Sequence, residues 1–197
     1  MKKNMNIKVI AAIVVLALIA ASLFLINILK NNKAVEEMKF VTNKGNIIQT
    51  EYIDLGKFKM KIPKDFEVMS EEYLELKYPT DNRPKLVYTN EDGSINFAFN
   101  LDSAYLDDEK LTDYVSTVES LFSKTGYSVN RMDYEANGIK FYTLTLKTPA
   151  IDSVIYNYMT IFSIDGHLMV ISFNCIDEYT DEWSDVSKFV IQSIKIK

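Results

Sequence analysis

Histidine and cysteine, the side chains that most often carry acid–base or nucleophilic chemistry near neutral pH, each occur once, as His167 and Cys175. A general base needs a nucleophile or an acid within hydrogen-bonding reach, and no neighbour of His167 in the sequence supplies one. His167 follows an Asp165-Gly166 turn signal, where a surface or edge imidazole is expected. A cysteine nucleophile needs a base and a lowered pKa, so we interpret Cys175 as a half-buried structural residue. Neither residue predicts a catalytic site.

Carboxylates are the next candidates, because clustered oxygen ligands can bind Ca²⁺. The spacing of an EF-hand and its central glycine are missing, however, and acids at a helix start are explained by capping and the helix dipole. We assign these acids to helix starts or to a solvated edge, and predict no metal site, no cofactor site and no catalytic residue. They are Asp102, Asp107, Asp108, Glu109 and Asp113, then Glu178, Asp181, Glu182 and Asp185, and at the edge Glu71, Glu72 and Glu75.

The 12 tyrosines are a further group that could serve binding. Exposed tyrosine favours protein or glycan contacts, because it offers a large contact area at a small entropy cost. Tyrosine in strands more often packs within the sheet. The sequence does not divide the tyrosines between these two uses.

The amino-terminal segment predicts a location. The apolar run from Val9 to Leu29 spans about 32 Å as a helix at about 1.5 Å per residue, enough for a hydrocarbon core of about 30 Å. Lys2, Lys3 and Lys8 precede it, which favours an amino terminus in the cytoplasm. We therefore predict a cytoplasmic tail (residues 1–8), a single transmembrane helix (residues 9–29) and a body outside the cytoplasm.

A cleaved signal peptide is the alternative, since Ala20-Ala21-Ser22 offers the small residues that a signal peptidase accepts. Cleavage there would leave an apolar new terminus, and the run is longer than a typical signal core, so an uncleaved anchor is favoured. A lipid-anchored form is not expected, because Cys175 lies far from the segment. The small residues of the run could also pair the helix with another inside a larger membrane complex.

Composition excludes several classes of function. All 27 acidic residues follow residue 30, and the whole chain has a net charge of −5 at pH 7. Such a body is repelled by nucleic acid and by anionic lipid heads, so nucleic-acid binding is not expected. A single cysteine excludes an internal disulfide, and the fold must be held by packing.

Periodicity predicts an α+β body over residues 47–197, after a stalk (residues 30–46) in which Val35, Met38 and Val41 have loosely helical spacing. Apolar residues recur at three- and four-residue spacing after Asp107, which predicts a helix ended by Gly126. A second helix is expected over residues 180–191. Between and around them we predict antiparallel strands at residues 47–53, 58–62, 66–69, 73–78, 85–89, 94–100, 127–135, 139–148, 154–164, 167–175 and 193–197. We expect helices on one sheet face and partial cover on the other.

The segment Phe58-Lys59-Met60-Lys61-Ile62-Pro63-Lys64-Asp65-Phe66 resembles the opening of the PsbP-like superfamily, in which a strand ends in Ile/Tyr-Pro and a Trp or Phe follows. Phe66 stands where Trp is more usual, and the order of elements over residues 47–197 is similar. The resemblance implies an α/β/α sandwich around an antiparallel sheet. It also implies an assembly, stabilising or binding role, with no catalytic set to carry over.

These observations lead to a first hypothesis: a membrane-anchored extracytoplasmic binding domain without catalytic activity, contacting an envelope protein or a cell-wall component. The alternative is a small-molecule or metal-binding module, possibly hydrolytic, that uses a pocket between sheet and helix. In a third version, the transmembrane helix does the work by pairing within a larger complex.

Overall fold

The computed structural model describes residue 30 and residues 38–81, 83–136 and 138–197. The predicted tail (1–8), the predicted transmembrane helix (9–29) and part of the predicted stalk lie outside these residues. Within the described ranges, no helix has the length and apolar character needed to cross a membrane. Residues Phe40–Lys197 form one compact unit, which carries the sheets and helices that follow.

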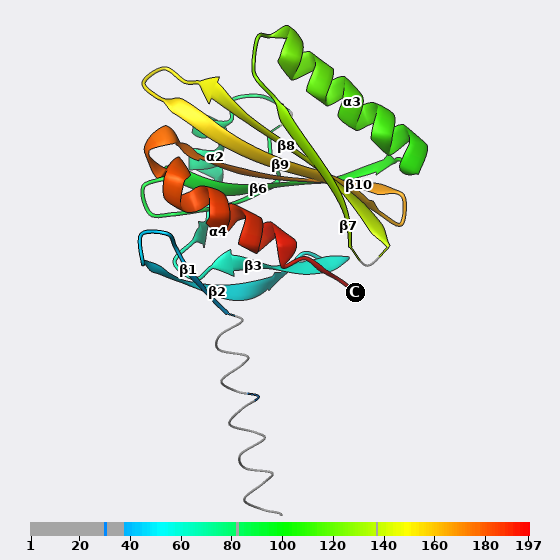
Figure 1. The fold of residues 1–197 in the computed structure, drawn as a ribbon. Helices are drawn as coiled ribbons and strands as arrows, with labels where there is room; N and C mark the ends of the chain where they lie inside the picture. The colour runs from blue at the N-terminus through cyan, green and yellow to red at the C-terminus, as the bar shows by residue number, and fades with distance from the viewer. Residues whose placement is uncertain (1–29, 31–37, 82, 137) are drawn as a thin grey trace, which may run out of the picture. The chain divides into compact units, whose positions relative to one another are not determined.

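A seven-stranded antiparallel sheet forms the centre of this unit (Figure 1). Two neighbouring strands of this sheet are joined by the Asp165-Gly166 turn, in which Asp165 has a φ of 51° and Gly166 a φ of 76°. These left-handed values fit the predicted two-residue hairpin. The strands lie in the order β4-β5-β6-β10-β9-β8-β7, with the bounds β4 (Glu67–Val68), β5 (Leu86–Thr89), β6 (Ile95–Tyr105), β7 (Asn130–Ala136), β8 (Ile139–Pro149), β9 (Val154–Ile164) and β10 (His167–Ile176).

A second, four-stranded sheet was not predicted. It has the order β1-β2-β3-β11, formed by β1 (Lys39–Val41), β2 (Ile47–Asp54), β3 (Phe58–Pro63) and β11 (Lys195–Ile196). Residues 39–41 are extended, although the spacing of apolar residues around them is loosely helical. The Phe40 ring packs with its centre 5.1 Å from that of Phe189. Local periodicity does not show that β11 returns to pair with β3, because that contact joins the two ends of the fold.

Helices cover both faces of the large sheet, instead of one (Figure 1). Helix α3 (Asp108–Lys124) packs against β9, while α4 (Thr180–Gln192) packs against the opposite face together with β3. A short helix α2 (Glu71–Lys77) replaces the strand predicted over residues 73–78. The Ser70 hydroxyl accepts a hydrogen bond from the Tyr73 backbone N–H, and Glu71 and Glu72 lie in the first turn. This cap and the favourable helix dipole explain why the segment is helical.

The two faces of the large sheet are filled to different degrees. We call the side of β10 that carries Leu168, Val170, Ser172 and Asn174 the α3 face, and the other side the α4 face. The α4 face is covered by one large apolar cluster that includes Phe97, Phe162, Phe173 and Cys175. The α3 face has two separate clusters, one under α3 around Leu111 and Val115 and one under α2 around Met69 and Val87. A strip of the α3 face between the two helices is left without an apolar cover.

Candidate functional site

A groove runs along the strip between α2 and α3. Its floor is β10, and its wider end is a cavity of about 490 Å³ lined by Tyr114 and Val118 of α3, Met159 of β9, and Val170 and Ser172 of β10. The floor changes character along β10, from Leu168 and Val170 at one end to Asn174 at the other. The β10 floor is thus apolar toward the α3 end and polar at the far end, while Asp81, Arg83 and Lys85 add charged side chains to the wall of the wider cavity.

Three asparagines form a row across the polar end of the floor. Asn174 of β10 lies in register with Asn96 of β6 on one side and with Asn157 of β9 on the other. Residues directly opposite each other on neighbouring strands share a face, so the three amides point into the groove side by side. The Asn96 Nδ2 donates to the Asn174 Oδ1 at 3.0 Å. The Asn157 Nδ2 donates to the Thr148 Oγ1 at 3.1 Å.

Asn96 has an acceptor that its surroundings do not satisfy. Its side chain is only 1% exposed, and its Oδ1 has no hydrogen-bond partner among the described residues. The amide cannot be turned around, because its Nδ2 already donates to two acceptors, the Gly93 carbonyl (3.1 Å) and the Asn174 Oδ1 (3.0 Å). A buried acceptor without a donor costs about 1–3 kcal/mol, so this oxygen marks a place where a donor is missing.

The row of amides lines a second cavity of about 230 Å³, which we call the amide pocket. Besides Asn96, Asn157 and Asn174, its walls include Lys77 and Tyr78 from the end of α2. The Tyr78 hydroxyl is buried and has no partner in full hydrogen-bonding geometry within the described residues. Burial raises the pKa of Tyr78, and a weaker side-chain hydrogen bond with the Asn174 amide acts in the opposite direction. Tyr78 is therefore a neutral hydroxyl that can still donate and accept.

Lys77 supplies the charge at the rim of the amide pocket. Its ammonium donates to the Gly93 carbonyl. Desolvation lowers the pKa of Lys77, while the nearby Asp92 carboxylate raises it. The cation is thus held by the protein's own groups.

The β5–β6 turn fixes these groups in place. Gly93 adopts φ +76°, a left-handed value that favours glycine, and a Cβ there would lie 2.5 Å from the Tyr73 hydroxyl oxygen of α2, so a larger residue would also require the Tyr73 side chain to move. The Asp92 Oδ1 accepts from the Ser94 backbone N–H at 2.9 Å. Hydrogen bonds from Ser94 are the main cause that lowers the pKa of Asp92. The rigid turn presents the Gly93 carbonyl to both Lys77 and Asn96.

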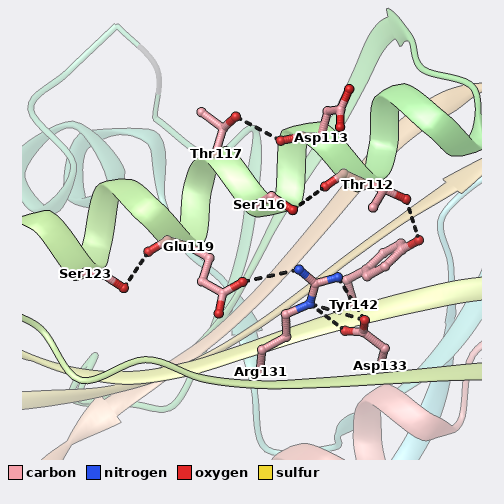
Figure 2. Close-up of polar contacts among 9 residues, drawn as sticks. All are labelled: Thr112, Asp113, Ser116, Thr117, Glu119, Ser123, Arg131, Asp133 and Tyr142. Atoms are coloured by element: carbon pink, nitrogen blue, oxygen red, sulfur yellow. Dashed lines mark hydrogen bonds and ion pairs between the residues drawn. The ribbon is translucent and has the colours of Figure 1, made fainter.

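A contrasting polar cluster, which we call the arginine clamp, lies under α3 on the same sheet face (Figure 2). Arg131 of β7 binds Asp133 with both Nε (2.9 Å) and Nη2 (2.8 Å), and its Nη1 reaches Glu119 of α3 at 3.2 Å. Its guanidinium carbon lies 5.2 Å from the centre of the Tyr142 ring. The Tyr142 hydroxyl in turn lies 3.0 Å from the Thr112 Oγ1 of α3. The clamp ties α3 to the sheet edge.

The polar groups of the clamp have partners. Hydrogen bonds to Asp133, the largest cause, and to Glu119 raise the pKa of Arg131 against the effect of burial. Figure 2 also shows three hydroxyls of α3 that donate to backbone carbonyls one turn earlier, a common way to satisfy Ser and Thr within a helix. The pairs are Ser116 with Thr112, Thr117 with Asp113, and Ser123 with Glu119.

Solved structures share this arrangement of sheet and helices. The solution structure of cyanobacterial PsbP (CyanoP) from Synechocystis sp. PCC 6803 matches with a TM-score of 0.55 at 12% identity, over 76% of this chain and 92% of that one. The fold is PsbP-like. LpqN of Mycobacterium tuberculosis, described as involved in cell envelope biogenesis, matches with a TM-score of 0.51 at 13% identity, over 78% of this chain and 94% of that one. No family model matches the sequence, and no curated protein matches it significantly. At these identities the likeness concerns the fold.

The PsbP-like opening motif has a clear structural role here. Strand β3 ends at Pro63. Phe66 is then buried between Phe97 of the large sheet and Trp183 of α4, with ring centres 6.0 Å and 5.4 Å away. The aromatic residue after the proline therefore joins the large sheet to the helix on its α4 face.

The two residues whose side chains are best suited to catalysis, His167 and Cys175, do not line the groove. His167 is partly exposed at the start of β10, a central strand and not an edge. Cys175 is buried, with 1% exposure, on the α4 face. Burial, the main cause, raises the pKa of the Cys175 thiol to about 11. The interpretation of Cys175 as structural agrees with this environment, although the residue is more than half-buried.

The candidate carboxylates have different roles in the structure. Asp107 caps α3, as predicted, and accepts from the Lys110 backbone N–H at 3.0 Å. The second helix is different, because α4 has no side-chain cap, and Glu182 instead accepts from Thr42 (2.8 Å) and Asn46 (2.6 Å) of the β1–β2 segment. Glu75 pairs with Arg83 at 2.9 Å. The side chains of Asp102 and Asp108 lie outside what the structure describes. Within its described part, no group of three or more His, Cys, Asp or Glu is placed to hold a metal ion.

The amide row was missed at the level of sequence, although a signal exists. Asn157 and Asn174 are equally far from the Asp165-Gly166 turn, so a two-residue hairpin must place them opposite each other. Asparagine is also disfavoured in strands, which makes its occurrence within each of β6, β9 and β10 informative. The tyrosines divide as well: Tyr142 and Tyr158 are buried, whereas Tyr114 is 37% exposed and lines the groove.

Proposed function

We propose that this protein is a single-pass, membrane-anchored extracytoplasmic binding domain that contacts an envelope protein or a cell-wall component through the groove between α2 and α3, without catalysis. The tail and the anchor are proposed over residues 1–8 and 9–29. The body includes the end of the predicted stalk (30–46), because β1 (Lys39–Val41) belongs to the small sheet. The apolar run 9–29 supports the anchor. The groove carries the proposal, because it is the part of the α3 face where buried polar groups lack partners.

A binding role agrees with the residues that line the groove. Its walls combine apolar side chains and a few amides and hydroxyls with charged side chains, Asp81, Arg83 and Lys85 in the wider cavity and Lys77 in the amide pocket. Ligand sites use such a mixture of apolar surface and a few polar groups. The residues lining its two cavities include neither His167 nor Cys175. The proposed binding role therefore uses neither the imidazole nor the thiol of the chain.

The alternative, a small-molecule module, is favoured by one observation. The amide pocket has the volume for a small ligand and presents unpaired polar atoms in a fixed arrangement. The two functions share one surface, and they differ in whether the ligand is free or part of a larger envelope structure.

Site-specific photo-crosslinking in cells tests the proposal. A photoreactive amino acid replacing Tyr114 faces the groove, whereas one replacing Ile47, 60% exposed in the small sheet, serves as the control. We expect a discrete crosslink to an envelope protein or to cell-wall material from the Tyr114 position and none from the Ile47 position. Equal crosslinking from both positions, or none from either, argues against the groove.

Fractionation tests the anchor separately. The intact chain should remain with membranes after a high-salt wash, since an apolar helix is not released by screening charges. Recovery of the intact chain in the cytosol, or of a trimmed chain in the medium, overturns the anchored form. Replacement of residues 9–29 by an unrelated transmembrane helix should preserve the Tyr114 crosslink, and loss of the crosslink would favour a role for helix pairing.

A further inference from the structure

We propose that the amide pocket binds one uncharged saccharide unit of a larger glycan. The proposal rests on the function proposed above and narrows it, because it names the chemistry that the polar end of the groove recognises.

The unpaired atoms of the pocket require a ligand that both donates and accepts. The Asn96 Oδ1 is a buried acceptor with no donor. The two hydrogen bonds of the Asn157 side chain use its Nδ2, so its Oδ1 is available to accept from a ligand. The Asn174 amide accepts from Asn96 through its Oδ1 and also interacts with the Tyr78 hydroxyl. The Tyr78 hydroxyl can donate or accept. A ligand hydroxyl donates one hydrogen bond and accepts others, so neighbouring hydroxyls on one ring suit this mixture.

The charged side chain among the described lining residues of the pocket, Lys77, is already held by groups of the protein. Lys77 donates to the Gly93 carbonyl and lies near Asp92, whose carboxylate is held by Ser94. The other lining residues that the structure describes are uncharged. A cationic ligand would therefore lose its hydration and meet a like charge, and an anionic ligand would have to compete with the Gly93 carbonyl and Asp92 for the ammonium. An uncharged ligand avoids these costs.

Peptide ligands fit the pocket less well than a saccharide does. A peptide that adds a strand needs a sheet edge, but β10 is paired on both sides, with β6 and β9. A helical peptide needs a row of apolar anchors, but asparagines occupy this end of the floor. What the pocket offers are side-chain amides flanked by Ile155 and Ile176, which suit a ring with polar edges and apolar C–H faces.

The size of the pocket suits one sugar ring. Its volume of about 230 Å³ corresponds to roughly eight water molecules at about 30 Å³ each. The groove continues past Ser172 toward Tyr114 and Val118, so the chain of a glycan has a path along β10 beyond the first unit.

Binding of the uncharged trimer of N-acetylglucosamine to the full chain tests this directly. The chain should be held in phospholipid nanodiscs, because maltoside and glucoside detergents carry sugar heads that would compete. We expect saturable binding by calorimetry, with an affinity at least about tenfold higher than for an acidic oligosaccharide of glucuronic acid or for a neutral blocked tripeptide.

Variants locate the site. Asn157→Leu should weaken saccharide binding about fivefold or more, as expected for one lost neutral hydrogen bond. Asn96→Leu should weaken it further, although this variant also loses two internal bonds. Asn130→Leu, an exposed strand asparagine outside the pocket, is the matched control and should bind normally.

Three results would overturn the proposal: no saccharide binding by the wild-type chain, equal or better binding of the tripeptide, or unchanged binding in Asn157→Leu. The first also implies that water alone serves the Asn96 Oδ1. In each case a crosslink from Tyr114 to an envelope protein would still stand, so the failure of this inference is distinguishable from the failure of the proposed function.

Discussion

The arginine clamp and the amide pocket lie on the same face of one sheet, but they differ in how their polar groups are paired. In the clamp, Arg131 joins Asp133 and Glu119 at 2.8–3.2 Å, and the Tyr142 hydroxyl reaches Thr112. In the pocket, the Asn96 Oδ1 and the Tyr78 hydroxyl are buried without partners in full hydrogen-bonding geometry. The clamp contains charges that are paired, and the pocket contains neutral groups that are not.

The difference shows what each polar group is there to do. The paired groups of the clamp hold α3 on the sheet, so their hydrogen bonds and ion pairs stabilise the fold. Unpaired buried groups reduce stability by about 1–3 kcal/mol each, and this cost is recovered only when something binds. The comparison therefore separates the structural polar groups of the α3 face from those available to a ligand.

The largest expected effect concerns access to the groove. Ser172 lines it, whereas Cys175 lies three residues further along β10 and faces the filled α4 side. Cys175 is 1% exposed, and burial raises the pKa of its thiol to about 11, so at pH 8 it is largely un-ionised. Alkylation by iodoacetamide should therefore be at least about tenfold faster for Ser172→Cys in a Cys175→Ala background than for the wild type. Similar rates would mean that the groove is closed or that the α4 face opens readily.

The clamp provides the largest expected change in stability. Arg131→Leu removes two ion pairs and a cation–π contact, each worth about 0.5–1 kcal/mol at this partial exposure. We expect a loss of about 2 kcal/mol, or roughly 4–8 °C in Tm. Arg83→Leu, which breaks only the exposed pair with Glu75, is the control and should change stability by less than about 0.5 kcal/mol. Equal losses in the two variants would contradict the distinction between clamp and surface pair.

The sequence predicted much of the fold wherever local signals decide the structure. Turn chemistry located the Asp165-Gly166 hairpin, and helical spacing located α3 and α4 to within a few residues. Helix α2 was misread as a strand, because Leu74, Leu76 and Tyr78 alternate with charged residues while the decisive signal, the Ser70 cap, lies outside that run. The pairing of β11 with β3 has no local signal at all.

The candidate site was less predictable than the fold, for a related reason. The amide row depends on the register of three strands, and only the pairing of β9 with β10 is fixed by a short turn. That Asn96 lacks a partner depends also on where α2 lies, and this helix was not predicted. Arg131 could be seen beside Asp133, but its contact with Glu119 requires the position of α3 on the sheet.

The paired hydroxyl of the clamp gives a smaller loss. Tyr142→Phe removes the 3.0 Å contact with Thr112 and keeps the ring under Arg131, so we expect a loss of about 1 kcal/mol. Urea unfolding followed by the fluorescence of Trp183, the single tryptophan, measures it. A double-mutant cycle with Thr112→Ala isolates the contact, and a coupling near zero would mean that this hydroxyl does not help to dock α3.

The smallest expected effect has the opposite sign and tests the comparison most closely. Tyr78→Phe deletes a buried hydroxyl that has no partner in full hydrogen-bonding geometry, so stability should stay the same or rise by up to about 1 kcal/mol, while saccharide binding falls. Tyr158→Phe deletes another such hydroxyl, on the α4 face, and should match the change in stability without affecting binding. The urea midpoint at constant m reports the first quantity and calorimetry the second. If Tyr78→Phe instead costs as much as Tyr142→Phe, its hydroxyl is engaged in the free protein, and the amide pocket is part of the fold in the same sense as the clamp.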